Sequence, residues 1–178
     1  MSARKAPALA AAPEVPPALM AALADPAMVA RMMCLLATPG VQITGPEGAA
    51  REAIRLLAGY DHERAAVIGL DARNRVVASD VLTVGNSKHC IMDPSQIYRW
   101  ALTQDVVVSR IIVAHNHPSG DATPSDADIA VTRRIVQVGR QLGVQCLDHL
   151  IVAGVATTSI REVHLDLFDA PAFDSCLT

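Results

Sequence analysis

The sequence predicts an α/β fold in which helices cover both faces of a mixed β-sheet. The β-branched run from Val106 to Val113 is typical of a strand buried on both faces. An amphipathic helix over 125–142 and a second apolar strand over 144–153 follow it, so parallel strands joined by a helix are expected. A hairpin earlier in the chain adds antiparallel strands, which makes the predicted sheet mixed.

Turn and cap signals define the elements before the central strand. Gly45-Pro46-Glu47 begins a helix that runs to about Gly59. Its apolar side is expected to consist of Ala50, Ile54, Leu57 and Ala58. Strands over 65–70 and 76–84, joined by a turn at 71–74, form the hairpin. After a short extended piece over 88–92, Asp93-Pro94 begins the next helix.

The central strand ends in two histidines, His115 and His117. Successive strand residues point to opposite faces, so these two share one face if the chain stays extended. Pro118 favours an extended residue before it. After a Ser/Gly-containing loop, Ser125 is the expected N-cap of a helix and Asp128 its N3 residue. The predicted core-facing stripe of that helix is Val131, Ile135, Val138 and Leu142.

Two imidazoles and one carboxylate, from a strand end and a helix start, form a three-ligand set. His115, His117 and Asp128 suit one zinc ion per chain, with the fourth tetrahedral position left to water, as in catalytic zinc sites. A single histidine at a strand end is more often a hydrogen-bonded polar residue, and Ser-x-x-Asp is more often a cap. The combination of both patterns after a buried strand favours the metal site.

The chain is expected to divide into four segments. Residues 1–17 are an Ala/Pro-rich tail, and residues 18–40 a helical segment that packs on the domain or on a second copy, which leaves a homodimer open. Residues 41–165 form the main domain. Residues 166–178 form an acidic and apolar C-terminal tail.

Composition narrows the functional classes. The 178 residues are 51% hydrophobic and carry a formal net charge of −3, which argues against a large basic surface for nucleic acid. The four cysteines form no C-x-x-C pair, so we expect free thiols of a reducing compartment. No apolar run approaches the length of a membrane span. A cytoplasmic location without a membrane partner is therefore expected.

The segment from His115 to Asp128 resembles a known motif. His115-Asn116-His117-Pro118-Ser119-Gly120, with Pro124-Ser125 and Asp128, is similar to the JAMM motif of the JAB/MPN metalloprotease superfamily, and more narrowly to its RadC-type branch. The resemblance extends from about Val41 to Ile160. It implies a three-layer, cytidine-deaminase-like fold and a zinc-dependent hydrolase that cleaves a peptide or isopeptide amide bond, often beside a ubiquitin-like modifier.

The resemblance also assigns roles to residues outside the ligand set. Glu63 in ERAAVIGLD matches the family's glutamate and is the expected general base. Ser125 matches the serine that hydrogen-bonds the developing oxyanion, while the same residue is the expected cap. His149, in LDHLIVAG, is expected to orient the sheet or to form a hydrogen bond behind the metal ligands.

Other functions remain open on the sequence alone. A zinc deaminase needs H-x-E with a distant P-C-x-x-C, and Cys90 and Cys146 are isolated, so this class is set aside. The RadC likeness suggests a DNA-repair-associated role on or near nucleic acid, although no helix-hairpin-helix module is recognisable at 17–40. Many MPN domains are non-catalytic interaction modules, but here all ligand positions are filled.

Overall fold

A computed structural model describes residues 40–82 and 92–169. The predictions for the 1–17 tail, for nearly all of the 18–40 segment, for residues 83–91 and for residues 170–178 therefore lie outside the described residues. In chain order, the helices and strands of these described residues are α3 (Pro46–Leu57), β1 (Ala65–Leu70), β2 (Val76–Leu82), α4 (Pro94–Leu102), β3 (Arg110–Asn116), α5 (Asp126–Leu142), β4 (Gln145–Ala153), β5 (Ala156–Ser159), α6 (Ile160–Val163) and α7 (Asp166–Asp169).

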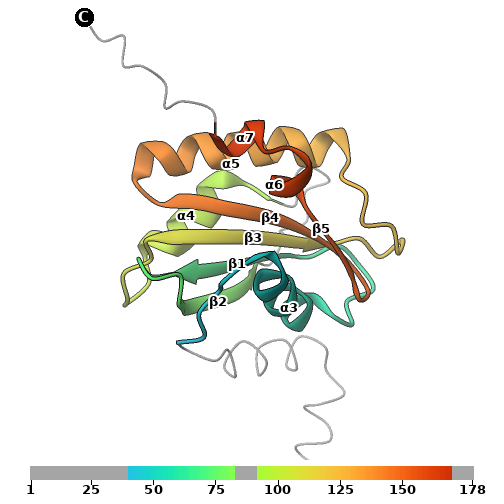
Figure 1. The fold of residues 1–178 in the computed structure, drawn as a ribbon, viewed down its shortest axis with the longest axis horizontal. Coiled ribbons are helices and arrows are strands. Elements are labelled where there is room, and N and C mark those ends of the chain that lie inside the picture. The colour runs from blue at the N-terminus through green and yellow to red at the C-terminus, as the bar shows by residue number, and fades with distance from the viewer. Residues whose placement is uncertain (1–39, 83–91, 170–178) are drawn as a thin grey trace, which may run out of the picture.

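The five strands form one mixed sheet in the order β2-β1-β3-β4-β5 (Figure 1). β3 lies at the centre, antiparallel to β1 and parallel to β4. β2 and β5 add antiparallel partners at the two edges. A parallel pair needs a crossover connection, and α5 supplies it between β3 and β4. The predicted mixed α/β fold is confirmed.

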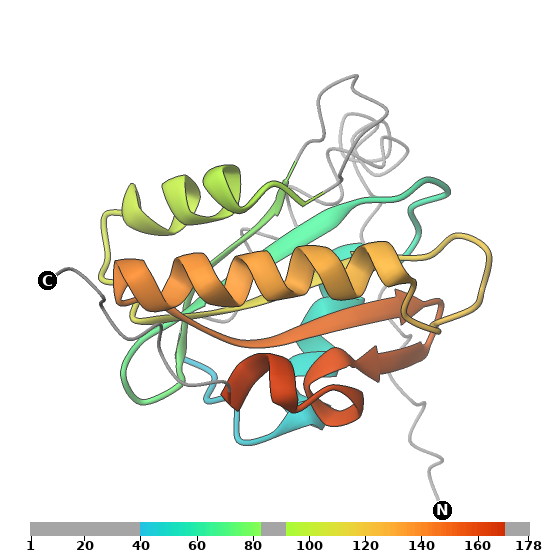
Figure 2. The same cartoon turned by 90° about the horizontal axis from the view of Figure 1, so that it is seen from above.

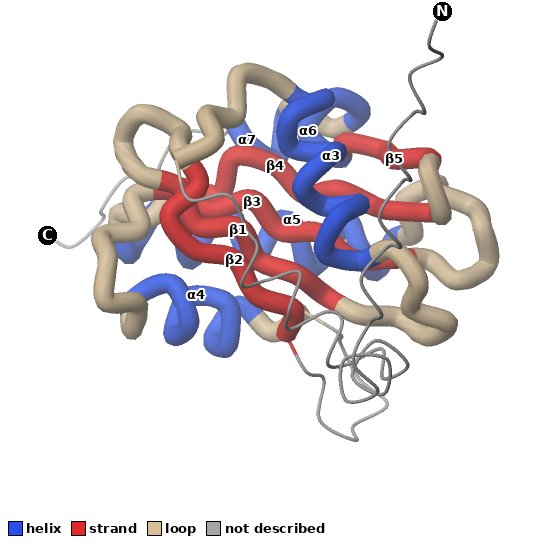
Figure 3. Tube along the Cα trace, turned by 90° about the horizontal axis from the view of Figure 1, so that it is seen from below, coloured by secondary structure: helices blue, strands red, loops and turns tan. Residues whose placement is uncertain are grey.

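Helices lie on both faces of the sheet. From above, α5 lies over the sheet, with α4 on one side and α6 and α7 on the other (Figure 2). From below, α3 covers the opposite face (Figure 3). Alternate residues of β3 enter the two cores: Ile111 and Val113 pack on the α5 side, and Ile112 and Ala114 pack on the α3 side. His115 and Asn116 continue this alternation at the end of the strand.

The buried parts of three elements differ from the predicted ones: in α3 the buried residues are Ala49, Ala53, Leu56 and Leu57 instead of the side that contains Ala50, Ile54 and Ala58. β3 begins at Arg110, and Val106 and Val107 before it are 47% and 80% exposed, so the β-branched run overstated the strand. In α5 the buried residues are Val131, Thr132, Ile135, Val136 and Gly139, whereas Leu142 is 44% exposed. The buried face of α5 is thus turned from the predicted stripe and has a hydroxyl at its centre.

No helix in the two described ranges, 40–82 and 92–169, is both long enough and apolar enough to cross a bilayer.

Gly139 sets how closely α5 approaches its neighbours. A Cβ at this position would lie 2.5 Å from Val144 O and would collide with the Tyr98 hydroxyl, which donates a 2.8 Å hydrogen bond to Ile135 O. We expect Gly139→Ala to lower the free energy of unfolding by about 1–3 kcal/mol through overpacking. At an exposed helical site the same change would stabilise by about 0.5–1 kcal/mol.

Urea denaturation of Gly139→Ala measures this effect, with Gln137→Ala on the exposed side of α5 as the control. The control is expected to stay within about 0.5 kcal/mol of the parent protein. A Gly139→Ala protein as stable as the parent would contradict the close α4–α5 packing.

Candidate metal centre

β3 presents both histidines at its carboxyl end, on the side that faces α5. His115 is a strand residue 4% exposed, and its backbone is paired with Ile151 of β4. The His117 N–H donates a 2.8 Å hydrogen bond to Val152 O, so the parallel ladder holds the chain extended for one more residue. This backbone pairing fixes the two-residue spacing that puts both rings on one face.

The start of α5 places Asp128. Ser125 is the N-cap, and its Oγ accepts the Asp128 N–H at 3.2 Å, while Asp128 Oδ2 accepts the Ser125 N–H at 2.8 Å. This reciprocal capping box holds the carboxylate against the first turn of the helix. The predicted cap at Ser125 and N3 position of Asp128 are confirmed.

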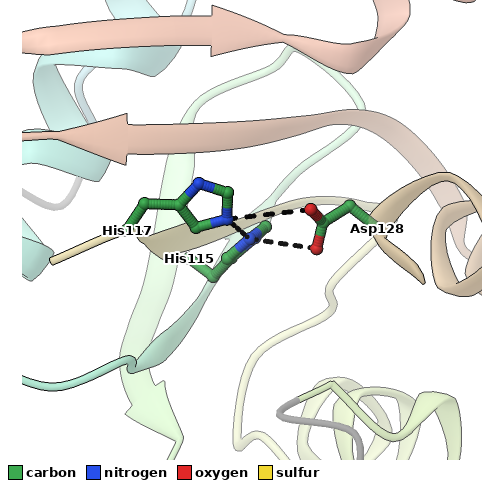
Figure 4. A group of neighbouring side chains, drawn as sticks. All are labelled: His115, His117 and Asp128. Atoms are coloured by element: carbon green, nitrogen blue, oxygen red, sulfur yellow. Dashed lines mark hydrogen bonds and ion pairs between the residues drawn. The ribbon is translucent and has the colours of Figure 1, made fainter. Parts of the chain in front are cut away.

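The three side chains converge between the end of β3 and the start of α5 (Figure 4). One donor atom from each of His115, His117 and Asp128 lies within 4.8 Å of the others. The two Nε2 atoms are 2.9 Å apart, and they lie 3.1 and 3.7 Å from the Asp128 oxygens Oδ1 and Oδ2, respectively. Ligands at about 2.0–2.2 Å from a tetrahedral zinc lie about 3.3–3.6 Å from one another, so the observed separations bracket the required ones.

Hydrogen bonds fix which nitrogen of His117 carries the proton. Nδ1 lies 2.8 Å from the carbonyl oxygen of Asp121, which can only accept. Nδ1 is therefore protonated. In the neutral ring Nε2 is then a bare lone pair directed at His115 and Asp128.

A chain of hydrogen bonds gives His115 the same tautomer. Thr132 Oγ1 lies 2.5 Å from Asp128 O, a carbonyl that can only accept, so the hydroxyl proton points there. His149 Nδ1, 2.5 Å from Thr132 Oγ1, must then donate to it. Burial lowers the pKa of His149 well below its ordinary value, and neighbouring His115 lowers it further, so the ring is neutral. His149 Nε2 accordingly accepts from His115 Nδ1 at 2.8 Å.

The donor set fits a divalent cation. With both Nδ1 atoms protonated, two bare Nε2 lone pairs face each other at 2.9 Å beside a carboxylate. Such an arrangement is repulsive without a cation between the nitrogens and is the usual one in metal sites, where the second ring nitrogen donates to a carbonyl or another partner. Partial burial raises the pKa of Asp128, but the adjacent His115 ring and the hydrogen bonds from Ser125 outweigh it and hold this pKa well below its usual range.

The Ser125 hydroxyl is already engaged. Its single proton points at Asp128 Oδ2, 2.5 Å away, and its oxygen accepts the Asp128 N–H. These contacts hold Oδ2 and leave Oδ1 to face His115. In this arrangement Ser125 positions the carboxylate, and an oxyanion would have to compete for the same proton.

Glu63 lies outside the cluster of donor atoms, in the exposed loop before β1. The β1–β3 register pairs Ala65 with His115, and the Asn116 N–H donates to Arg64 O at 3.1 Å. One residue further, Glu63 is level with His117, at a register position on the side of the two histidines. The backbone thus brings the predicted base to the rim of the site.

Sequence reasoning did not single out Thr132 or Asn116. The signal for Thr132 was its position four residues after Asp128, which lets a hydroxyl bond the helix carbonyl one turn back. Asn116 lies between the two histidines but on the opposite face of the strand. A search for ligands on the histidine face therefore does not include it.

Comparisons with known proteins identify relatives of this chain. The RadC-like JAB domain family model matches residues 43–165, a range that includes Glu63, both histidines and Asp128. The chain is 43% identical over 101 residues to a UPF0758 protein of Thermosynechococcus vestitus, which covers 57% of this chain and 40% of that protein. It is 37% identical over 122 residues to a UPF0758 protein of Staphylococcus carnosus, which covers 68% and 53%, respectively. The chain spans about half the length of the curated relatives it matches.

The metal content of the protein tests the ligand set. Protein loaded with Zn²⁺ and then desalted should retain about one ion per chain, the number that three convergent ligands hold. His117→Ala removes one ligand and should retain little. Elemental analysis measures both, with His164→Ala, outside the cluster, as a control that should bind like the parent. Equal metal in the His117→Ala and parent proteins would contradict the site.

Thr132→Val tests the hydrogen-bond relay behind His115. Without the hydroxyl, His149 Nδ1–H has no acceptor, so the tautomer that leaves His115 Nε2 bare is no longer enforced. Loss of such a contact behind a ligand typically weakens metal binding about 10–100-fold. Competition with a chromogenic chelator measures the dissociation constant, with Thr158→Val on β5 as the matched control. An unchanged constant for Thr132→Val would exclude the relay.

Proposed function

The chain belongs to the RadC-like JAB domain family, and from this premise we propose that it is a zinc-dependent hydrolase that cleaves an amide bond with a metal-activated water. The single observation that carries the proposal is the convergence of one ligand atom each from His115, His117 and Asp128 within 4.8 Å, with the Nδ1 atoms of both histidines hydrogen-bonded behind them. A structural histidine needs no such arrangement, because its second nitrogen would normally be paired with a donor or with water.

His115, His117 and Asp128 would hold the zinc ion, one per chain. Three protein ligands leave one tetrahedral position open, as in catalytic zinc sites and unlike closed structural ones. Zinc bound there supplies a Lewis acid that polarises a carbonyl group and makes water a stronger acid. The relay through His149 and Thr132 keeps the His115 ring in the ligating tautomer while substrate and product exchange.

Glu63 is the proposed general base. Its exposed position level with His117 lets it accept a proton from the attacking water and return that proton to the leaving amine. Ser125 is proposed to steady the oxyanion only after its hydroxyl turns from Asp128 Oδ2. Its positioning of Asp128 requires no such turn, and both roles depend on the same hydroxyl.

The proposed substrate is a protein or peptide amide, including an isopeptide bond to a ubiquitin-like modifier. This part of the proposal comes from the family likeness, and the longer relatives carry residues that this chain does not match. A role on nucleic acid and a non-catalytic interaction module are the competing functions. The complete ligand set favours catalysis over an interaction module, since a module has no need of bare ligand nitrogens.

The test is Glu63→Gln, which keeps the size of the side chain and removes the proton acceptor. Zinc content should stay at the parent level, and chelator-sensitive amide cleavage should fall by about 10²–10⁴-fold. Cleavage is measured on zinc-loaded protein with a fluorogenic peptide library and a lysine-isopeptide conjugate. Glu47→Gln, at an exposed glutamate of α3, is the control.

Two results would count against the proposal. Normal cleavage by the Glu63→Gln protein would assign the proton transfer to another group. Failure of the zinc-loaded parent protein to cleave any peptide or isopeptide probe would remove the amide hydrolase itself.

A further inference from the structure

Asn116 is buried beside the candidate metal centre but takes no part in the donor cluster. It lies between His115 and His117 on β3 and is 5% exposed. Because strand residues alternate, its side chain leaves the strand on the face opposite to the two imidazoles. A buried amide there must find hydrogen-bond partners, and those partners lie in the loop before β1.

The amide of Asn116 binds the peptide groups on either side of Glu63. Its Oδ1 accepts the Arg64 N–H at 2.7 Å. Its Nδ2 donates to His62 O at 3.1 Å and lies 3.4 Å from Tyr60 O. The His62 carbonyl belongs to the peptide before Glu63, and the Arg64 N–H belongs to the peptide after it. One side chain therefore clamps both peptide planes that define the backbone dihedrals of Glu63.

The orientation of this amide is determined by its partners. The Arg64 N–H can only donate and the His62 carbonyl can only accept, so Oδ1 and Nδ2 cannot be exchanged. The Asn116 backbone adds a third link, because its N–H donates to Arg64 O at 3.1 Å. Side chain and backbone together continue the β1–β3 ladder past its last regular pair, Ala65 with His115.

We infer that Asn116 is a positioning residue for catalysis: it fixes Glu63 relative to the histidines from within the strand that carries them. This inference rests on the proposed function and deepens it. His115 and His117 would hold the metal, and Asn116 holds the backbone of Glu63. Three consecutive residues at the end of β3 and directly after it thereby define the distance between ligands and base. A shift of β3 moves all of them together.

The chemistry requires asparagine at this position. The clamp needs one acceptor and one donor in a planar group that is short enough to reach the neighbouring chain. Aspartate keeps the shape but offers no donor and turns a charge toward the His62 carbonyl. Alanine offers neither group. Asn116→Asp and Asn116→Ala therefore remove half and all of the clamp.

Asn116 could instead have only a structural role, as a buried polar residue whose hydrogen bonds stabilise the fold. The experiment separates this role from the positioning role by asking whether the effect of Asn116→Ala on kcat depends on the presence of Glu63. In zinc-loaded protein, Asn116→Ala should lower kcat about 10–100-fold with KM nearly unchanged, the usual cost of misplacing a catalytic group by about 1 Å. In a Glu63→Gln background the same change should lower the residual kcat less than about twofold, since there is no base left to misplace.

A second readout does not depend on activity. Losing the clamp should speed amide hydrogen exchange at Arg64 about tenfold or more. Zinc content should remain at the parent level because Asn116 faces away from the ligands. The control is Tyr98→Phe, which removes one buried hydrogen bond, to Ile135 O, without approaching the site. It should leave kcat and the Arg64 exchange rate unchanged.

The outcomes separate the two proposals. Equal losses of kcat from Asn116→Ala in both backgrounds, unchanged kcat in an active enzyme, or unchanged Arg64 exchange would each overturn the positioning role and leave the hydrolase standing. A zinc-loaded parent protein without any amide cleavage would overturn both. Loss of kcat that disappears in the Glu63→Gln background, with faster Arg64 exchange and intact zinc, supports the inference.

Discussion

The structure depends on one closed ring of hydrogen bonds and close contacts that joins β3, β4 and α5. His115 of β3 contacts His149 of β4, His149 contacts Thr132 of α5, and Thr132 bonds Asp128 O, whose own carboxylate returns to His115. The strands and the crossover helix of the parallel unit thus meet in a single buried polar network. A buried polar network with an unpaired member is less stable than apolar side chains in the same place, so each of these groups must keep its hydrogen-bond partner. The sheet and the two hydrophobic cores hold β3, β4 and α5 in the positions that these contacts require.

The ligands were predictable from the sequence because each is placed by a local rule. Strand alternation pairs His115 with His117, and a capping box places Asp128 three residues after Ser125. The histidine behind them depends on a long-range detail. The β3–β4 register shifts between Ile111 and Ile112, so that Val113 rather than Ala114 lies beside His149. This one irregularity turns His149 to the α5 face, and no local pattern reveals it.

Helix faces were the less predictable part, for a reason that lies in the composition. Aromatic residues make up only 3% of the chain, and small apolar residues occur on several sides of each helix. In α3 the buried positions are Ala49, Ala53, Leu56 and Leu57, against a predicted side that began at Ala50. In α5 the buried face includes Thr132, which a hydrophobic criterion rejects but which the ring of hydrogen bonds requires. Polar contacts, more than apolar periodicity, set the rotation of α5.

The same logic explains why the proposed base lies on an exposed loop rather than in the core. Metal ligands need fixed tautomers, which buried partners enforce, whereas a proton shuttle must reach both water and the leaving group. Exposure leaves the Glu63 carboxylate within reach of water and of a bound substrate. The backbone must set the position of this carboxylate, because the side chain itself is exposed. The amide of Asn116 fixes the two peptide groups that flank Glu63. Because Asn116 lies on β3 beside His115, this also fixes Glu63 relative to the proposed ligands.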